Sequence, residues 1–172
     1  MATQLERRTE TQAAVVDAAL ELFLESDSTD PSLDAVAERA GVAKSTVLYH
    51  FGSRLGLLQA VSDWLTAEMG ARLSPLEQYE DARTFARAFL RDGRSPRVRI
   101  FLMVGDHLQY ARHDQRIGRG LESLIDTFGR FGITERVLVV AAATMTMTRQ
   151  VTFGNVDDAT IDRFVDELFT GA

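Results

Sequence analysis

The sequence contains no cysteine, only three prolines and no long hydrophobic run. Without cysteine the chain can form no disulfide bond, no thiolate metal site and no cysteine nucleophile. The longest apolar stretch, near residues 137–143, is far shorter than the roughly 20 residues of a membrane-spanning helix. The start of the chain is polar and lacks the apolar segment of a secretory signal. We therefore expect a cytoplasmic protein with no membrane partner.

Motifs of catalysis and metal binding are also missing. The chain has no phosphate-binding glycine loop, no G-x-S-x-G and no EF-hand run. His107 and His113 are six residues apart, about 240° around a helix, and cannot bind a metal as an i, i+4 pair would. Asp106 and His113 share a helix face, but no nucleophile lies at a matching spacing. We predict that the protein is not an enzyme and holds no cofactor or metal.

The distribution of charged residues along the chain is more informative than the net charge. A net charge of −6 argues against nucleic acid, because DNA affinity comes largely from neutralising phosphates. Residues 1–60 carry five basic and nine acidic side chains. Residues 39–54, however, contain three basic side chains, Arg39, Lys44 and Arg54, and no carboxylate. One face of the N-terminal region can therefore be basic although the chain as a whole is acidic.

Helical periodicity runs through the whole chain, with Gly, Pro and Ser between the periodic segments. A chain of 172 residues that is 45% hydrophobic suits one compact domain or two small ones. We predict an all-α fold of about nine helices. The expected helices span residues 9–25, 32–40, 44–50, 75–91, 96–113, 115–131, 134–152 and 157–169, and a longer helix follows the cap Ser53.

Residues 32–50 have the pattern of a helix-turn-helix unit. Two short helices flank Gly41, a residue that tolerates the left-handed backbone at a helix end. In such a unit the second helix enters the major groove of DNA. Val47 and Phe51 are predicted to face inward, with Val42 at the corner. The outward side chains, suited to phosphates and base edges, are Lys44, Ser45, Thr46, Tyr49 and His50.

Arg54 is expected at the start of the next helix, after the capping residue Ser53. Free N–H groups and the helix dipole favour an anion there, and a DNA phosphate is the expected anion. The pattern by itself leaves two interpretations open. One is a DNA-binding unit, and the other is an ordinary helix–glycine–helix corner whose polar face is only solvated.

The run "AERAGVAKST", the aromatic cluster that ends at Phe51 and the F-x-S-basic step into the next helix occur together. With them, residues 9–68 resemble the N-terminal DNA-binding domain of the TetR family of transcriptional regulators. The resemblance implies a three-helix helix-turn-helix domain at 9–68 and a helical effector-binding and dimerisation domain at 69–172. It implies phosphate contacts by Thr46 and Arg54 and base-reading candidates at Lys44 and Ser45.

The chain departs from the family's pattern in three places. Ala43 stands where members commonly have Ser, so the recognition helix lacks its usual hydroxyl cap, at a cost of roughly 1 kcal/mol. Leu48 stands where Tyr is usual, and Tyr49, turned by about 100° around the helix, does not inherit its role. Leu55 and Gly56 replace the acidic residues that tend to follow the basic one.

The last two expected helices carry apolar faces. The first combines small residues at 141–144, which allow close backbone approach, with large apolar residues at 137, 138, 145 and 147, and a one-sided stripe marks the second. In the resembled family the corresponding pair forms a four-helix bundle with a second copy across a two-fold axis. The alternative is that both helices pack only within their own chain. We expect a homodimer whose interface contains Val137, Ala141, Met145, Ile161, Phe164, Val165 and Leu168.

The expected helix at 96–113 is apolar nearly all round over residues 98–104, which predicts a central position. An apolar pocket with a few polar groups is the usual composition of a small-molecule site. The candidate effector contacts are Trp64, Phe85, Phe89, Phe101, Met103, His107, Tyr110 and Met147. The alternative interpretation of these residues is an ordinary hydrophobic core.

Two functions follow from these patterns. The first is a ligand-responsive transcriptional regulator, a repressor that binds a palindromic operator as a homodimer and is released by a small, largely apolar effector. The second is a helical small-molecule-binding or protein-interaction module that has lost operator binding. Salt-dependent binding to DNA distinguishes the two.

Overall fold

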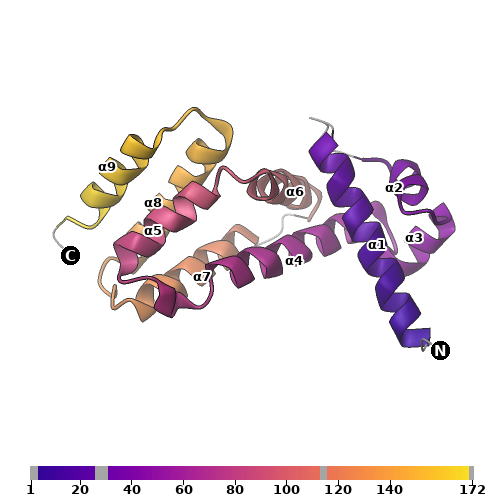
Figure 1. Ribbon diagram of the computed structural model, residues 1–172, viewed down its shortest axis with the longest axis horizontal. Coiled ribbons are helices and arrows are strands. Elements are labelled where there is room, and N and C mark those ends of the chain that lie inside the picture. The colour runs from indigo at the N-terminus through magenta and orange to yellow at the C-terminus, as the bar shows by residue number, and fades with distance from the viewer. Residues whose placement is uncertain (1–3, 26–30, 113–115, 171–172) are drawn as a thin grey trace.

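The computed structural model describes residues 4–25, 31–112 and 116–170, and their side chains other than those of Leu5 and residues 109–119. Within this part the chain is entirely helical, which confirms the predicted fold class (Figure 1). The helices are α1 Gln4–Glu25, α2 Leu33–Arg39, α3 Lys44–Phe51, α4 Arg54–Leu73, the 3-10 helix η1 Leu76–Gln78, α5 Ala82–Asp92, α6 Pro96–Arg112, α7 Arg116–Arg130, α8 Val137–Phe153 and α9 Asp158–Leu168. No helix of the described ranges is long and apolar enough to span a membrane.

Hydroxyl caps start two helices of the N-terminal unit, α2 and α4. Ser32 Oγ accepts a hydrogen bond from Ala35 N at 3.1 Å ahead of α2, and Ser53 Oγ accepts one from Gly56 N at 3.0 Å ahead of α4. Each cap satisfies one of the N–H groups that a helix start leaves unpaired. Between them, Gly41 adopts a left-handed backbone at φ +66°, as predicted for the corner between two short helices.

The expected helix at residues 75–91 is shorter than predicted. Residues 76–78 form only the 3-10 turn η1, and α5 begins at Ala82. The reason is Asp81, whose carboxylate accepts a hydrogen bond from Thr84 N at 2.7 Å and so caps the helix there. This bond holds the pKa of Asp81 below its usual value. The helix expected from residue 134 likewise begins later, at Val137.

Two hydrophobic cores organise the molecule. The first joins α1, α2, α3 and the first half of α4, and it includes Ile100, Val104 and Leu108 from one face of α6. The second joins α5, α7, α8 and α9 around Phe128, which is fully buried. Helix α6, seen end-on between the two halves in Figure 1, therefore packs partly against the N-terminal helices although it lies in the segment 69–172.

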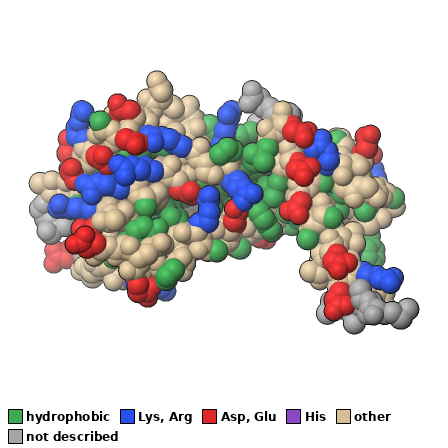
Figure 2. Space-filling model, viewed as in Figure 1, with side chains coloured by type: hydrophobic (Ala, Val, Ile, Leu, Met, Phe, Trp, Pro, Cys, Tyr) green, Lys and Arg blue, Asp and Glu red, His purple; other side chains and the backbone are tan. Residues whose placement is uncertain are grey.

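Helix α9 packs on α5 through an apolar seam edged by ion pairs. Ile161 and Val165 are completely buried against the second core. Beside them, Arg91 Nη2 lies 2.8 Å from Asp162 Oδ1, and Arg87 Nε lies 3.3 Å from the same oxygen. Figure 2 shows these basic and acidic side chains interleaved over α5 and α9. The ion pairs align the two helices, although exposed pairs of this kind add little stability.

The predicted dimer residues are largely occupied inside the single chain. Ala141, Ile161 and Val165 have no exposed surface, because all three lie in the second core, where α9 lays its apolar stripe on α5. The others pack half-buried against the same core, and these are Val137, Met145, Phe164 and Leu168. The large apolar side chains that α8 leaves exposed are Leu138, Val139 and Phe153.

Candidate nucleic-acid interface and ligand cavity

Helices α2 and α3 form a compact corner on the first core. Val42 N donates to Ala37 O at 3.0 Å, which closes the turn after Gly41. Val47 is completely buried, and Phe51 packs half-buried against the same core. Ala43 precedes α3 with no side-chain cap, as the sequence predicted. The orientation of α3 is therefore set by packing rather than by capping.

The outward face of α3 follows from the helical period. Its exposed side chains, at i, i+1, i+4 and i+5, are Lys44, Ser45, Leu48 and Tyr49. Tyr49 is 75% exposed and Leu48 is 39% exposed. Thr46 and His50, also predicted to face outward, lie half-buried at the edges of this face. The prediction missed Leu48, although its i+4 spacing from Lys44 places it on the same face.

Carboxylates engage Lys44 and Arg39, two of the basic side chains predicted for this region. Lys44 Nζ lies 2.8 Å from Asp34 Oδ2. Arg39 donates to Glu21 at 3.2 Å and to Glu25 at 2.6 Å, which ties α2 to α1. The hydrogen bond from Arg39 holds the pKa of Glu25 below its usual value. The Lys44 pair is exposed and weak, so a DNA phosphate can take the place of Asp34, whereas Arg39 serves the fold.

The start of α4 passes very close to the end of α3. Gly52, at φ +73°, ends α3, Ser53 caps α4, and Arg54 is the first residue of α4 with a half-buried side chain. A Cβ on Gly56 would lie 1.9 Å from the carbonyl oxygen of Phe51. Only glycine fits there without a backbone shift. Gly56 therefore sets how closely α4 approaches the recognition helix.

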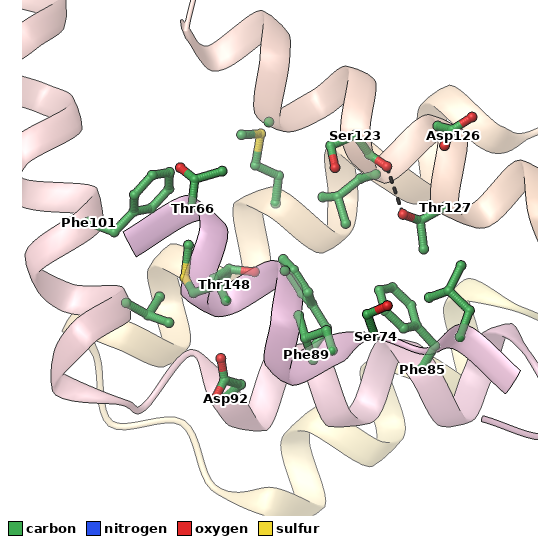
Figure 3. Close-up of a pocket in the computed structure, with 18 of the residues that line it drawn as sticks. Thr66, Ser74, Phe85, Phe89, Asp92, Phe101, Ser123, Asp126, Thr127 and Thr148 are labelled. Atoms are coloured by element: carbon green, nitrogen blue, oxygen red, sulfur yellow. Dashed lines mark hydrogen bonds between the residues drawn. The ribbon is translucent and has the colours of Figure 1, made fainter. Parts of the chain in front are cut away.

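A cavity of about 510 Å³ opens between α4 and α7, with α5, α6 and α8 as its other walls (Figure 3). Its surface is mainly apolar and includes Phe85, Phe89 and Phe101 from the predicted set. Met145, predicted at the dimer interface, also lines it. The volume lies within the roughly 300–1,000 Å³ of small-molecule sites.

The other predicted contacts do not line the cavity. Met103 and His107 lie on other faces of α6, because they are two and six residues from Phe101, which turns their side chains by about 200° and 240° from it. His107 Nδ1 lies 3.2 Å from Met103 O. The Arg97 guanidinium lies over Trp64, with its Cζ 5.5 Å from the centroid of the Trp64 ring. The remaining two are Met147, which packs against the second core, and Tyr110, whose side chain lies outside the described residues.

Polar side chains that the prediction missed stand among the cavity walls. They include Asp63 and Thr66 on α4, Asp92 at the end of α5, and Asp126 on α7. The helical period could have pointed to the first two, because Asp63, Thr66 and Leu73 recur on one face of α4. The residues of α5 and α7 come together with them only through tertiary packing.

The short helices α2 and α3, braced by α1 and α4, have the architecture of a helix-turn-helix unit, and they lie beside a helical half with a ligand-sized cavity. Residues 15–61 match the family model described as bacterial regulatory proteins, tetR family. The N-terminal helices therefore form a helix-turn-helix unit of the tetR type. The relatives that the chain matches are transcriptional regulators and not enzymes, which confirms the prediction on that point.

Two curated relatives come from Pseudomonas putida. The HTH-type transcriptional regulator SrpR is 40% identical over 68 residues, which cover 40% of this chain and 29% of SrpR. The uncharacterised HTH-type transcriptional regulator TtgW is also 40% identical over 68 residues, which cover 40% of this chain and 46% of TtgW. The matched segment thus spans less than half the length of either relative.

Two solved structures share the fold over nearly the whole chain. A TetR-family regulator from Mesorhizobium loti superposes with a TM-score of 0.60 at 17% identity, over 94% of each chain. NalD of Pseudomonas aeruginosa, described as the secondary repressor of the MexAB-OprM multidrug efflux pump, superposes with a TM-score of 0.61 at 18% identity. That match covers 95% of this chain and 97% of NalD. At such identities the likeness concerns the fold alone.

Proposed function

We propose that the protein is a repressor that binds a palindromic operator as a homodimer and is released by a small, largely apolar effector. The observation that carries the proposal is the pair of helices α4 and α6, each of which has one face in the first core and another in the cavity. On α6, Val104 and Leu108 pack under the recognition unit while Phe101 and Leu102 line the cavity. A ligand that moves either helix therefore moves the support of α3.

Linkage supplies the test of the ligand response. If an effector weakens operator binding by some factor, operator DNA must weaken effector binding by the same factor. The operator is obtained by selecting bound sites from genomic DNA with the purified protein. Effector affinity is then measured with and without that operator. A ligand in the cavity whose affinity is unchanged by the operator contradicts the proposed mechanism, and failure to enrich any site favours the module that has lost operator binding.

Lys44 and Arg54 are expected to contribute in different ways. Arg54, at the start of α4, is proposed as a phosphate contact, so Arg54→Ala should weaken binding to all sequences alike and lower the salt slope by about one contact. Lys44, exposed at the start of α3, is proposed as a base contact. Lys44→Ala should cost roughly 1–3 kcal/mol on the selected site and relax selectivity at one position per half-site.

The measurement is a titration of each variant against the selected site, single-base variants of it and random DNA, at several salt concentrations. Arg136→Ala removes the same charge from an exposed position ahead of α8 and serves as the matched control, with little change expected. Asp34→Asn should strengthen binding, because it releases Lys44. The opposite result would show that α3 lies in the groove in another orientation. In that case Lys44→Ala would lower affinity for all DNA sequences equally, and Arg54→Ala would change the base preference.

Leu48 is proposed to contact the methyl group of a thymine. It is the apolar member of the outward face of α3, and the thymine methyl is the apolar group that the major groove offers. Replacing one thymine of the operator by deoxyuridine should weaken binding about fourfold, the value of one buried methyl group. In Leu48→Ala that sensitivity should disappear. If the parent and Leu48→Ala lose the same affinity on replacement of each thymine by deoxyuridine, the proposed contact is contradicted.

A further inference from the structure

The cavity walls carry more negative than positive charge. Three carboxylates, those of Asp63, Asp92 and Asp126, line the cavity, and Arg130 is the lining guanidinium. Arg130 Nη2 already lies 3.2 Å from Asp126 Oδ2. Asp63 accepts a hydrogen bond from the neutral amide of Gln59 at 2.6 Å. An anion entering the cavity would therefore meet carboxylates and a guanidinium that is already paired.

Asp92 lies in a crowded acidic corner. Its Oδ2 lies 2.9 Å from Nη2 of Arg72, which does not line the cavity. Burial raises the pKa of Asp92, Arg72 opposes this rise, and the nearby carboxylate of Glu68 adds to it. Glu68 pairs with Arg97 through Oε1, while its Oε2 is buried with no hydrogen-bond partner among the described residues. A further positive charge near Asp92 would favour the ionised form of that carboxylate.

Aromatic rings cover the wall between the charged groups. The rings of Phe85 and Phe89 lie 5.9 Å apart at a tilt of 35°, and Phe101 faces the cavity from α6. Figure 3 shows Asp92 and Asp126 on opposite sides, with Phe85 and Phe89 between them and Phe101 at one edge. The face of an aromatic ring attracts a cation within about 6 Å, so the rings accept apolar groups and positive charge together.

We propose that the cavity binds a lipophilic cation, whose charge is held by the carboxylates of α4 and α5 and whose apolar groups lie against the phenylalanine rings. This inference rests on the proposed function, since it names the chemical class of the effector. Asp63 is the principal counter-charge, because Arg72 already pairs with Asp92 and Arg130 with Asp126. Neutral and anionic compounds of the same shape gain the apolar contacts but lose the Coulomb attraction.

Calorimetric titration of the full chain with two ions of one shape tests the charge preference. The probes are tetraphenylphosphonium, a cation, and tetraphenylborate, an anion, with triphenylphosphine oxide as a neutral relative. We expect the cation to bind at least tenfold more tightly than either of the others. Asp63→Asn and Asp92→Asn should each weaken cation binding roughly fivefold to tenfold, and Arg130→Gln should strengthen it.

Asp17→Asn, which removes an exposed carboxylate of α1 far along the chain from the cavity walls, should leave cation binding unchanged. The proposal is overturned if the anion or the neutral probe binds as tightly as the cation or more tightly. It is also overturned if none of the three probes binds, or if neither Asp63→Asn nor Asp92→Asn changes the affinity for the cation. The ligand response is judged separately. If the cation binds but operator affinity is unchanged, only the proposed ligand response is refuted. If the neutral probe binds most tightly and releases the operator, only the proposed preference for a cation is refuted.

Discussion

Replacing Gly56 with alanine is expected to destabilise the protein by about 3 kcal/mol, at the upper end of what overpacking usually costs. The added Cβ would lie 1.9 Å from the carbonyl oxygen of Phe51, a backbone atom that cannot rotate away. Relief requires α3 and α4 to move apart, which also turns the outward face of α3. Urea unfolding should show a lower midpoint, and operator affinity should fall even where the variant remains folded.

Gly129→Ala is the matched control. Gly129 lies in α7, is exposed, and has nothing within 4 Å of the position of a Cβ. Because alanine favours a helix over glycine by about 1 kcal/mol, this variant should be slightly more stable than the parent. If Gly56→Ala unfolds at the same urea concentration as the parent and binds operator normally, the close passage between α3 and α4 does not control the recognition unit.

Replacing Leu138 with aspartate is expected to convert the proposed dimer into monomers. Leu138 and Val139 are each 57% exposed, and Phe153 is exposed further along the same side of α8. Burial of such side chains by a second copy removes apolar surface from water, and a charge placed among them would be left unpaired. Because a palindromic operator engages two recognition helices at once, operator affinity should fall by about a hundredfold or more.

Leu24→Asp makes the same chemical change at a position on α1 that is 51% exposed, and it should leave the protein dimeric. Sedimentation velocity gives the oligomeric state, and circular dichroism checks that both variants remain folded. The substitution Phe164→Asp is less informative, because Phe164 packs against the second core of its own chain. A Leu138→Asp protein that sediments as a folded dimer would place the interface elsewhere.

Local chemistry explains why the sequence predicted the helices and the corner at Gly41. Ser53 caps α4, Gly41 takes the left-handed backbone, and Ala43 leaves α3 uncapped, because each of these features depends on residues within one turn. The same local rule explains the outward position of Lys44 and Tyr49. The helix expected from residue 75 failed where the competing cap, Asp81, lay inside the predicted range.

Tertiary packing decided what distant residues do. The sequence places Arg39 in the same basic segment as Lys44, but in the fold Glu21 and Glu25 lie within 3.2 Å of its guanidinium. The stripe containing Ile161 and Val165 had to be buried, but its period could not say whether α5 or a second copy would cover it. A helical period specifies which residues share a face, whereas the partner of that face depends on how all helices pack together. The recognition helix was therefore determined by the sequence alone, and the charged cavity by the tertiary structure.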